Sequence, residues 1–214
     1  MILESRPLEG RFVRLEPLAE GHREALREAC EADPAIWELY PYSMAGTGFE
    51  PYWTRSMRRI EAGEAVIFAV SLGGAVVGVS GFGPDRVNAT TEIGGTYLHP
   101  DARGGPVNPE AKRLMLAHAF ESGARRVQFR VDAANLRSAA AMRKLGAVQD
   151  GVLRRDMITW TGRVRDTIIF SILEDEWPAV RDGLDQRLAG FEGPADESPS
   201  PSREGVGVRA PCSR

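Results

Sequence analysis

Hydrophobic residues recur along the chain with the periods of strands and of helices, and the two patterns are interspersed. Seven runs have the short apolar or alternating pattern of strands: 11–18, 65–72, 75–83, 90–98, 125–133, 151–160 and 163–174. Gly73 and Gly74 separate two of these runs and indicate a tight hairpin, because glycine adopts the positive φ that such turns require. Antiparallel pairing of neighbouring runs is therefore expected.

Segments with helical spacing lie between the strand-like runs, at 19–33, 54–63, 109–121, 136–146 and 175–191. The helix at 109–121 stands between two of those runs, as in the crossover that joins parallel strands. We predict an α/β fold whose mixed, mostly antiparallel sheet has about seven strands, a central strand–helix–strand crossover and flanking helices. Residues 1–191 are expected to form this single domain, and the polar segment 192–214 is expected to be a disordered tail.

The charge and the hydropathy of the chain each argue against one class of partner. Its 27 Lys and Arg residues are outnumbered by 30 Asp and Glu residues, so the net charge is −3 and there is no basic field for nucleic acid. No apolar stretch approaches the roughly 18 residues of a membrane span, and no signal peptide is visible. We expect a cytoplasmic protein that binds neither nucleic acid nor membrane.

The two cysteines give no sign of disulfide or metal chemistry. Cys30 lies in a helical pattern and Cys212 in the predicted tail, and no spacing of Cys and His residues fits a zinc site. No metal site is expected.

A turn rich in glycine and proline stands directly before the helix at 109–121. Asn108 occupies the position of an N-cap and Pro109 the first helical position, and the helical pattern places Lys112 on the polar face. Such a turn is compatible with a tight strand-to-helix connection and also with an anion site at the helix N-terminus. The amides available to an anion there would be those of Gly104, Gly105, Val107 and Asn108.

The sequence around this turn resembles a known family. "YLHP" at 97–100 is followed by Arg103, by the glycine turn and by "PEAKRLMLAHAFE" at 109–121. These features are similar to those of the GNAT superfamily of acyl-CoA N-acyltransferases, particularly its ribosomal-protein N-terminal acetyltransferase branch. There a strand ending in Y-x-x-P leads into a loop, Q/R-x-x-G-x-G/A, that wraps the coenzyme A pyrophosphate. Pro106 and Asn108 depart from the loop pattern, where the family usually has Gly and Gly or Ala.

A second block, "RVQFRVDAANLRSAAAMRKLGAVQDG" at 126–151, matches the family's strand, N-x-x-S, short helix ending in K-L-G-F, and E-G. The resemblance implies that Asn135 bonds the pantetheine arm or the loop holding it, and that Ser138 lies near the coenzyme sulfur. It also implies that Arg143 and Lys144 meet the 3′-phosphate. Taken alone, the same residues also read as a helix cap, a first-turn serine and solvated charges.

The resemblance assigns twelve residues in all to the coenzyme: Tyr97, Leu98, His99, Arg103, Gly104, Gly105, Val107, Asn108, Asn135, Ser138, Arg143 and Lys144.

The implied reaction moves acetyl from acetyl-CoA to a primary amine in a direct ternary complex. It needs a neutral amine, a stabilised oxyanion and a proton for the departing thiolate. An α-amine with a pKa of about 8 is more often neutral at pH 7 than a lysine-type amine at about 10.4, which favours α-amine acceptors. Ser138 is our first choice as proton donor, and a backbone N–H near Leu98 our choice as oxyanion donor.

Two carboxylates are candidate bases, Glu92 within one strand and Asp132 at the end of the next, although either could instead be an exposed charge or an arginine's partner. Strand alternation places Glu92 and Leu98 on one face of the strand and Tyr97 on the other. Gly94 and Gly95 between them indicate a bulge or a close approach of backbones.

The acceptor is expected to contact the irregular aromatic segment between the first two helices. Its candidate residues are Trp37, Glu38, Tyr40 and Trp53. A small-molecule amine and a protein N-terminus both stay open as acceptors, and so does a homodimer. Two other functions also stay open: a non-catalytic module that binds coenzyme A or acyl-CoA, and a GNAT-like enzyme with a donor other than acetyl.

Overall fold

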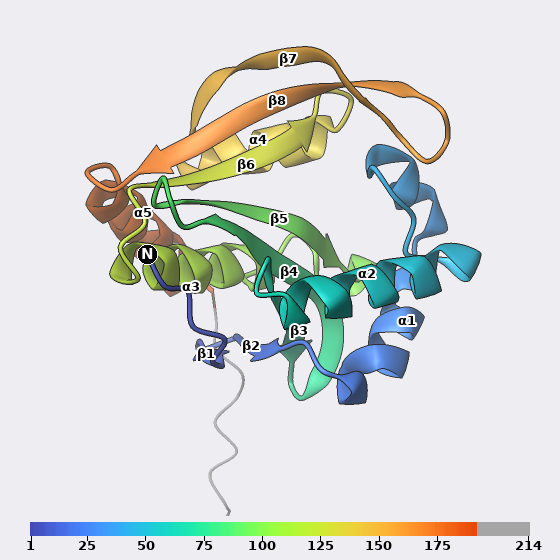
Figure 1. Ribbon diagram of the computed structural model, residues 1–214. Coiled ribbons are helices and arrows are strands. Elements are labelled where there is room, and N and C mark those ends of the chain that lie inside the picture. Colours follow the sequence, from blue (N-terminus) through green and yellow to red (C-terminus); the bar gives the residue numbers. More distant parts are fainter. Residues whose placement is uncertain (192–214) are drawn as a thin grey trace, which may run out of the picture.

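The structure is a computed structural model that describes residues 1–191, and one β-sheet of eight strands runs through this part of the chain (Figure 1). The strands are β1 (Leu8–Glu9), β2 (Val13–Pro17), β3 (Val66–Leu72), β4 (Ala75–Asp85), β5 (Thr90–Leu98), β6 (Arg126–Asp132), β7 (Val148–Ile158) and β8 (Val164–Leu173). Their order in the sheet is β1-β2-β3-β4-β5-β6-β8-β7. The tail predicted at 192–214 lies outside the described residues.

Helices cover both faces of the sheet. They are α1 (Arg23–Glu31), α2 (Phe49–Glu61), α3 (Val107–Glu121), α4 (Leu136–Leu145) and α5 (Trp177–Ala189), with short 3₁₀ turns η1 (Glu20–His22), η2 (Pro34–Leu39), η3 (Gly46–Gly48) and η4 (Pro100–Ala102). One core lies between the sheet and α3, α4 and α5, and a second lies between the sheet and α1 and α2. None of the helices in residues 1–191 has the length and hydrophobicity of a membrane span.

The predicted α/β fold is confirmed, including its central crossover. Every neighbouring pair in the sheet is antiparallel except β5 and β6, which are parallel and joined by α3. This layering explains the continuous apolar run of β3, because Val66 and Phe68 face one core while Ile67 and Ala69 face the other.

Two boundaries differ from the sequence prediction. The short pair of β1 and β2 replaces the single strand expected at 11–18 and brings the sheet to eight strands in the described residues. Helix α2 begins at Phe49 rather than at Thr54, so Tyr52 and Trp53 are helical and buried. Burial of these aromatic rings explains the earlier start, since packing overrides the low helix propensity of aromatic residues.

A buried carboxylate fixes the N-terminal strands to α3. Glu110 is 6% exposed, and its oxygens accept hydrogen bonds from the backbone N–H groups of Arg11 (2.8 Å), Phe12 (2.7 Å) and Val13 (2.8 Å). A Cβ on Gly10 would lie 2.4 Å from the Glu110 carboxyl, so glycine is required at that position. The turn between β1 and β2 is thus held by one side chain from the first turn of α3.

We predict that Glu110→Gln lowers the free energy of unfolding by about 2–3 kcal/mol, because an amide replaces a charged acceptor of three N–H groups. The midpoint of thermal unfolding should fall by roughly 5–10 °C. Glu121→Gln, at the exposed C-terminal end of the same helix, is the matched control and should change little. Equal midpoints for the two variants would contradict this role of Glu110.

Candidate active site

A deep cleft opens where the two parallel strands of the sheet separate. β5 and β6 pair only from Thr90–Glu92 to Arg126–Gln128, and beyond that point they diverge (Figure 1). The cleft between them has a volume of about 1130 Å³ and is lined by residues from both faces of the sheet. It is large enough to hold an extended ligand together with a second molecule.

A β-bulge in β5 sets the shape of this cleft. Tyr97 pairs with Val79 and Gly94 with Gly81, so two residues of β5 lie opposite the single Ser80 of β4. Gly95 has a φ of +61°, which favours glycine, and the Tyr42 hydroxyl would lie 3.1 Å from a Cβ there. The bulge predicted from the paired glycines is present.

The bulge also reverses the faces that simple alternation predicts. Ile93 and Leu98 both face the core of α3, whereas Tyr97 faces the core of α1 and α2. Glu92, next to Ile93, therefore faces the same side as Tyr97, not the side of Leu98. The prediction that Glu92 and Tyr97 lie on opposite faces was wrong, because the extra residue shifts the period by one.

The bulged residue Thr96 is held from both faces of the sheet. The Tyr40 hydroxyl donates to its carbonyl oxygen at 2.6 Å from the α1 side. From the α3 side, Lys112 Nζ donates to its Oγ1 at 2.6 Å, and Ser80 Oγ lies 2.7 Å from the same oxygen. These contacts hold the backbone of β5 open toward the cleft.

Lys112 is a buried lysine, not the exposed one expected from the helical pattern. It is 4% exposed, lines the cleft and forms no salt bridge within residues 1–191. Burial lowers its pKa to about 7 from the ordinary 10.5. The helical pattern misplaced it because the cleft lies against this part of α3, where Asn108, four residues earlier, also lines the cleft.

The glycine turn forms one end of the cleft. Gly104 has a φ of +81°, and a Cβ on Gly104 or Gly105 would meet nothing within 4 Å. Helix α3 begins at Val107, so Asn108 is inside its first turn and not at the N-cap as predicted. The N–H groups of a helix's first turn lack intrahelical acceptors, and here they stand beside open space over two glycines.

Arg103 links this turn to the rest of the molecule. Its Nη1 forms a 2.5 Å ion pair with Asp33, and its Nε donates to the Leu98 carbonyl at 2.8 Å. Its Nη2 is buried and lacks a hydrogen-bond partner in the described residues. His99 accepts from the N–H of Asp101 at 3.3 Å and is not among the residues that line the cleft.

Helix α4 contributes the second wall of that end. Asn135 is 8% exposed and caps the helix, since its Oδ1 accepts from the N–H of Ser138 at 3.0 Å. Asn135, Ser138 and Lys144 all line the cleft. Arg143 does not line it, because its guanidinium lies 5.7 Å from the Phe170 ring.

The two candidate bases are in different surroundings. Glu92 lines the cleft and forms no salt bridge in the described chain, and burial raises its pKa above the usual range. Asp132 is 3% exposed and accepts from Arg163 Nη2 at 2.5 Å and from the N–H of Ala134 at 2.9 Å. Donors already occupy both oxygens of Asp132, whereas Glu92 has no charged partner within 4 Å in the described chain.

Other side chains of the site also have structural partners. The Tyr97 hydroxyl donates to the Ala29 carbonyl at 2.7 Å, and burial raises its pKa to about 12. Val107 is a core residue of α3, so any contact it makes in the cleft is through its backbone. Leu98 lines the cleft, and its side chain belongs to the α3 core.

The aromatic segment is largely core. Trp37 is fully buried and stacks on Tyr97 with ring centroids 4.6 Å apart, and Trp53 is 4% exposed and does not line the cleft. Both were expected to contact an acceptor, but their rings fill the layer between the sheet and α1 and α2. Of the four residues predicted to bind the acceptor, Tyr40 lines the cleft, and Trp37, Glu38 and Trp53 do not.

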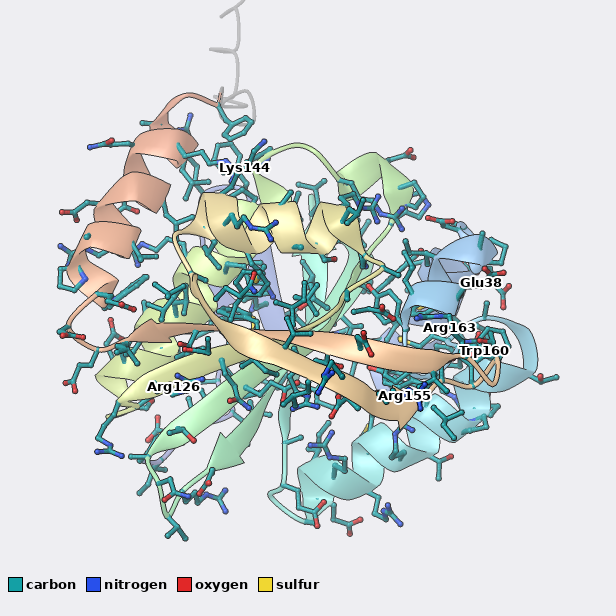
Figure 2. The ribbon with its side chains drawn as sticks, turned by 90° about the horizontal axis from the view of Figure 1, so that it is seen from above. Glu38, Arg126, Lys144, Arg155, Trp160 and Arg163 are labelled. Atoms are coloured by element: carbon teal, nitrogen blue, oxygen red, sulfur yellow. The ribbon has the colours of Figure 1, made fainter. Side chains whose placement is uncertain are left out.

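The tip of the β7–β8 hairpin closes over this segment. Trp160 Nε1 donates to the Trp37 carbonyl at 2.9 Å, and Arg163 Nη2 donates to the Glu38 carbonyl at 3.1 Å. Figure 2 shows Glu38, Trp160 and Arg163 together at this point. Trp160 is 54% exposed at this point.

The comparison with protein families decides the classification. Residues 13–148 match the family model described as "Acetyltransferase (GNAT) domain". The chain belongs to the GNAT acetyltransferase family. The predicted resemblance is confirmed, and the chain is that of an acyl-CoA-dependent acetyltransferase.

Solved GNAT structures are similar over most of the chain. A GCN5-related N-acetyltransferase from Brucella melitensis is 31% identical to this chain with a TM-score of 0.80, and the match covers 87% of each of the two chains. A protein from T. thermophilus described as an acetyltransferase is 37% identical with a TM-score of 0.78, and covers 88% of this chain and 100% of its own. Mycobacterium smegmatis RimJ in complex with CoA-disulfide is 22% identical with a TM-score of 0.70, covering 85% and 92%. No curated protein sequence matches the chain.

Sequence motifs of the GNAT family did not reveal every cleft residue. Arg59, Arg130 and Arg165 line the cleft on the α1 and α2 side, and Arg187 lines it on the α5 side. Arg59, Arg165 and Arg187 lie outside the motifs, and Arg130 lies within the second block but has no role in the motif. Arg165 and Arg130 meet through a hydrogen bond of 3.5 Å from Arg165 Nη2 to the Arg130 carbonyl. A signal was available for Lys112, because it stands one helical turn after Asn108.

We predict that Lys112→Met stabilises the protein most at low pH. The unfolded chain holds the lysine proton up to about pH 10.5 and the folded chain releases it near pH 7, so wild-type stability rises with pH across that window. The methionine variant should gain about 2–4 kcal/mol at pH 6.5 and progressively less toward pH 10, measured by urea unfolding. Lys144→Met, which removes an exposed lysine, is the control. Parallel stability curves for wild type and Lys112→Met would contradict the prediction.

Proposed function

We propose that this protein transfers acetyl from acetyl-CoA to a primary amine in one step, within a ternary complex. The observation that carries the proposal is the cleft itself, which runs through the sheet from the glycine turn at α3 to the carboxylate of Glu92. A donor and an acceptor can thus enter from opposite faces and meet between β5 and β6.

The residues at the α3 end suit a phosphate-bearing coenzyme. Open space lies over Gly104 and Gly105, the first-turn N–H groups of α3 adjoin it, and the buried Arg103 Nη2 is without a partner in the described chain. Lys144 and Arg187 line the same end and supply positive charge. The Oδ1 atom of Asn135 accepts the hydrogen bond of the helix cap. Its Nδ2 can therefore donate a hydrogen bond to an amide carbonyl of the coenzyme.

The proposed chemistry assigns one role to each of two side chains. When bound, acetyl-CoA supplies the thioester whose C–S bond breaks as the C–N bond forms. Glu92 takes the first proton from the ammonium form of the acceptor, and its raised pKa suits a base that works near neutral pH. Ser138 donates its hydroxyl proton to the departing sulfur. The acceptor nitrogen then gives its second proton back to the Ser138 oxygen. The products are the acetamide and the free thiol.

A covalent relay through a cysteine is not part of the proposal. Cys30 is fully buried, and burial raises the pKa of its thiol to about 12, so the nucleophilic thiolate is not available. Direct transfer from donor to acceptor remains the route that the described residues support.

We predict that acetyl-CoA and CoA each raise the midpoint of thermal unfolding by about 5–10 °C at 100 times their Kd, whereas NAD does not. Asn135→Asp keeps the cap oxygen and removes the amide donor. It should leave the midpoint of the free protein unchanged and raise the Kd for CoA about tenfold. An unchanged Kd would remove the proposed contact, and the absence of any shift with CoA would remove the proposed function.

We predict that Glu92→Gln lowers kcat about 100-fold while the Kd for acetyl-CoA stays the same. In wild type kcat/KM should fall as pH drops through the raised pKa of Glu92, and the variant should lose this dependence. Asp132→Asn is the comparison, and its main effect should be lower stability because Arg163 loses its ion pair. Full turnover by Glu92→Gln would exclude Glu92 as the base. Coenzyme binding without turnover on any amine would favour the non-catalytic binding module.

A further inference from the structure

Three arginines line the same cleft as Glu92, on the side of the sheet opposite to α3 and α4. Arg59 comes from α2, Arg130 from β6 and Arg165 from β8. The charges of all three act on the Glu92 carboxyl, yet none forms a salt bridge with it. The space between them belongs to the cleft.

These arginines lie away from the part of the cleft assigned to the coenzyme. In β6 Phe129 points into the core of α3 and α4, and in β8 Phe170 does the same. Alternation therefore places Arg130 and Arg165 on the opposite face, the one that α1 and α2 cover. The glycine turn and α4 are on the other side of the sheet, so phosphates bound there would not neutralise this group.

Arg130 already has an acidic partner, but Arg165 is only partly neutralised. Arg130 forms an ion pair with Asp156 at 2.5 Å. Asp132, the acid next to Arg165, forms its close ion pair with Arg163, at 2.5 Å. Arg165 reaches the same Asp132 only at 3.9 Å.

Arg165 is nonetheless a buried guanidinium. It is 4% exposed, and its hydrogen bonds are to Thr167 Oγ1 at 3.0 Å and, at 3.5 Å, to the Arg130 carbonyl. Burial lowers its pKa. A buried cation with such weak pairing gains from a further carboxylate, and a guanidinium fork binds carboxylate well.

Arg59 has a similarly incomplete set of partners. Its Nη2 donates to the Glu64 carbonyl at 3.5 Å, and it forms no salt bridge within the described chain. A Cβ on Gly83 would lie 3.8 Å from Arg59 Nη2 and 4.0 Å from Glu92 Cβ, so both side chains border one space. Besides Glu92 and Asp132, two acids line the cleft: Glu64 is exposed, and Asp85 accepts hydrogen bonds from Asn88.

We propose that the acceptor is a small amine that carries a carboxylate beside its nitrogen, in the manner of an α-amino acid. Arg59 and Arg165 bind the carboxylate, and Glu92 faces the amine. This inference rests on the proposed acetyl transfer and narrows its acceptor. A polyamine would bring only positive charge to a region with three guanidinium groups, and most protein N-termini have no carboxylate next to the amine.

The test compares L-α-amino acids with their carboxamides as acceptors, using release of CoA at saturating acetyl-CoA. The carboxylate of an α-amino acid raises the pKa of the neighbouring amine, so less of that amine is neutral and nucleophilic near pH 7. Without recognition of the carboxylate, the carboxamide would therefore be the better acceptor. We expect wild type to prefer the acids by about tenfold or more in kcat/KM, because the arginines bind the carboxylate.

The variants separate recognition from general damage. Arg59→Gln should lower kcat/KM for the acids about tenfold and leave the amides unchanged, whereas Arg58→Gln, on the exposed neighbouring position, should change neither. Arg165→Lys keeps the positive charge but loses the paired N–H groups of the guanidinium, and it should also lose the preference for acids. The midpoint of thermal unfolding of this variant shows whether it still folds.

Several results would overturn the inference. They are equal use of acids and amides by wild type, an equal loss for both in Arg59→Gln, or no acetylation of either series by a protein that acetyl-CoA still stabilises. Absence of that stabilisation would instead overturn the proposed function.

Discussion

The parallel pair of β5 and β6 is the constraint on which the site depends. Backbone N–H and C=O groups inside a protein need partners, and two neighbouring strands normally supply them to each other. Here the pairing stops after Glu92, and the bulge at Gly95 and Thr96 turns the rest of β5 away. Backbone groups are thereby available to whatever enters the cleft. Tyr40 and Lys112 fix the bulge, because each forms a hydrogen bond to Thr96 from a different face of the sheet.

Buried charge is used in three different ways around this opening. Glu110 is fully satisfied by backbone N–H groups and has a structural role in fastening β1 and β2. Lys112 has hydroxyl partners only, and burial favours its neutral form, with a pKa near 7. Arg165 keeps its charge with incomplete neutralisation and lines the cleft. The degree of pairing thus separates structural charges from those that a ligand can complete.

Periodicity and motifs predicted the α/β class and the central crossover, and they named Asn108, Asn135, Ser138 and Lys144, which line the cleft, but not Lys112. They could not predict the faces of β5, since one extra residue at Gly95 reverses every later side chain. They also placed Trp37 and Trp53 at an acceptor site, because aromatic residues in an irregular segment look alike whether they line a cleft or fill a core. The arginines near Glu92 come from three separate elements, α2, β6 and β8, which no motif in the sequence links to one another.

The rim on the acceptor side is built from side chains that bond carbonyl oxygens. Trp160 and Arg163 bond the carbonyls of Trp37 and Glu38, and Tyr40 bonds that of Thr96. A carbonyl is present whatever residue occupies the position, so the accepting side of each bond places no demand on residue identity. Glu38 is exposed, and Figure 2 shows it beside Arg163 and Trp160. Its side chain can therefore be exchanged while the hairpin stays attached to its carbonyl.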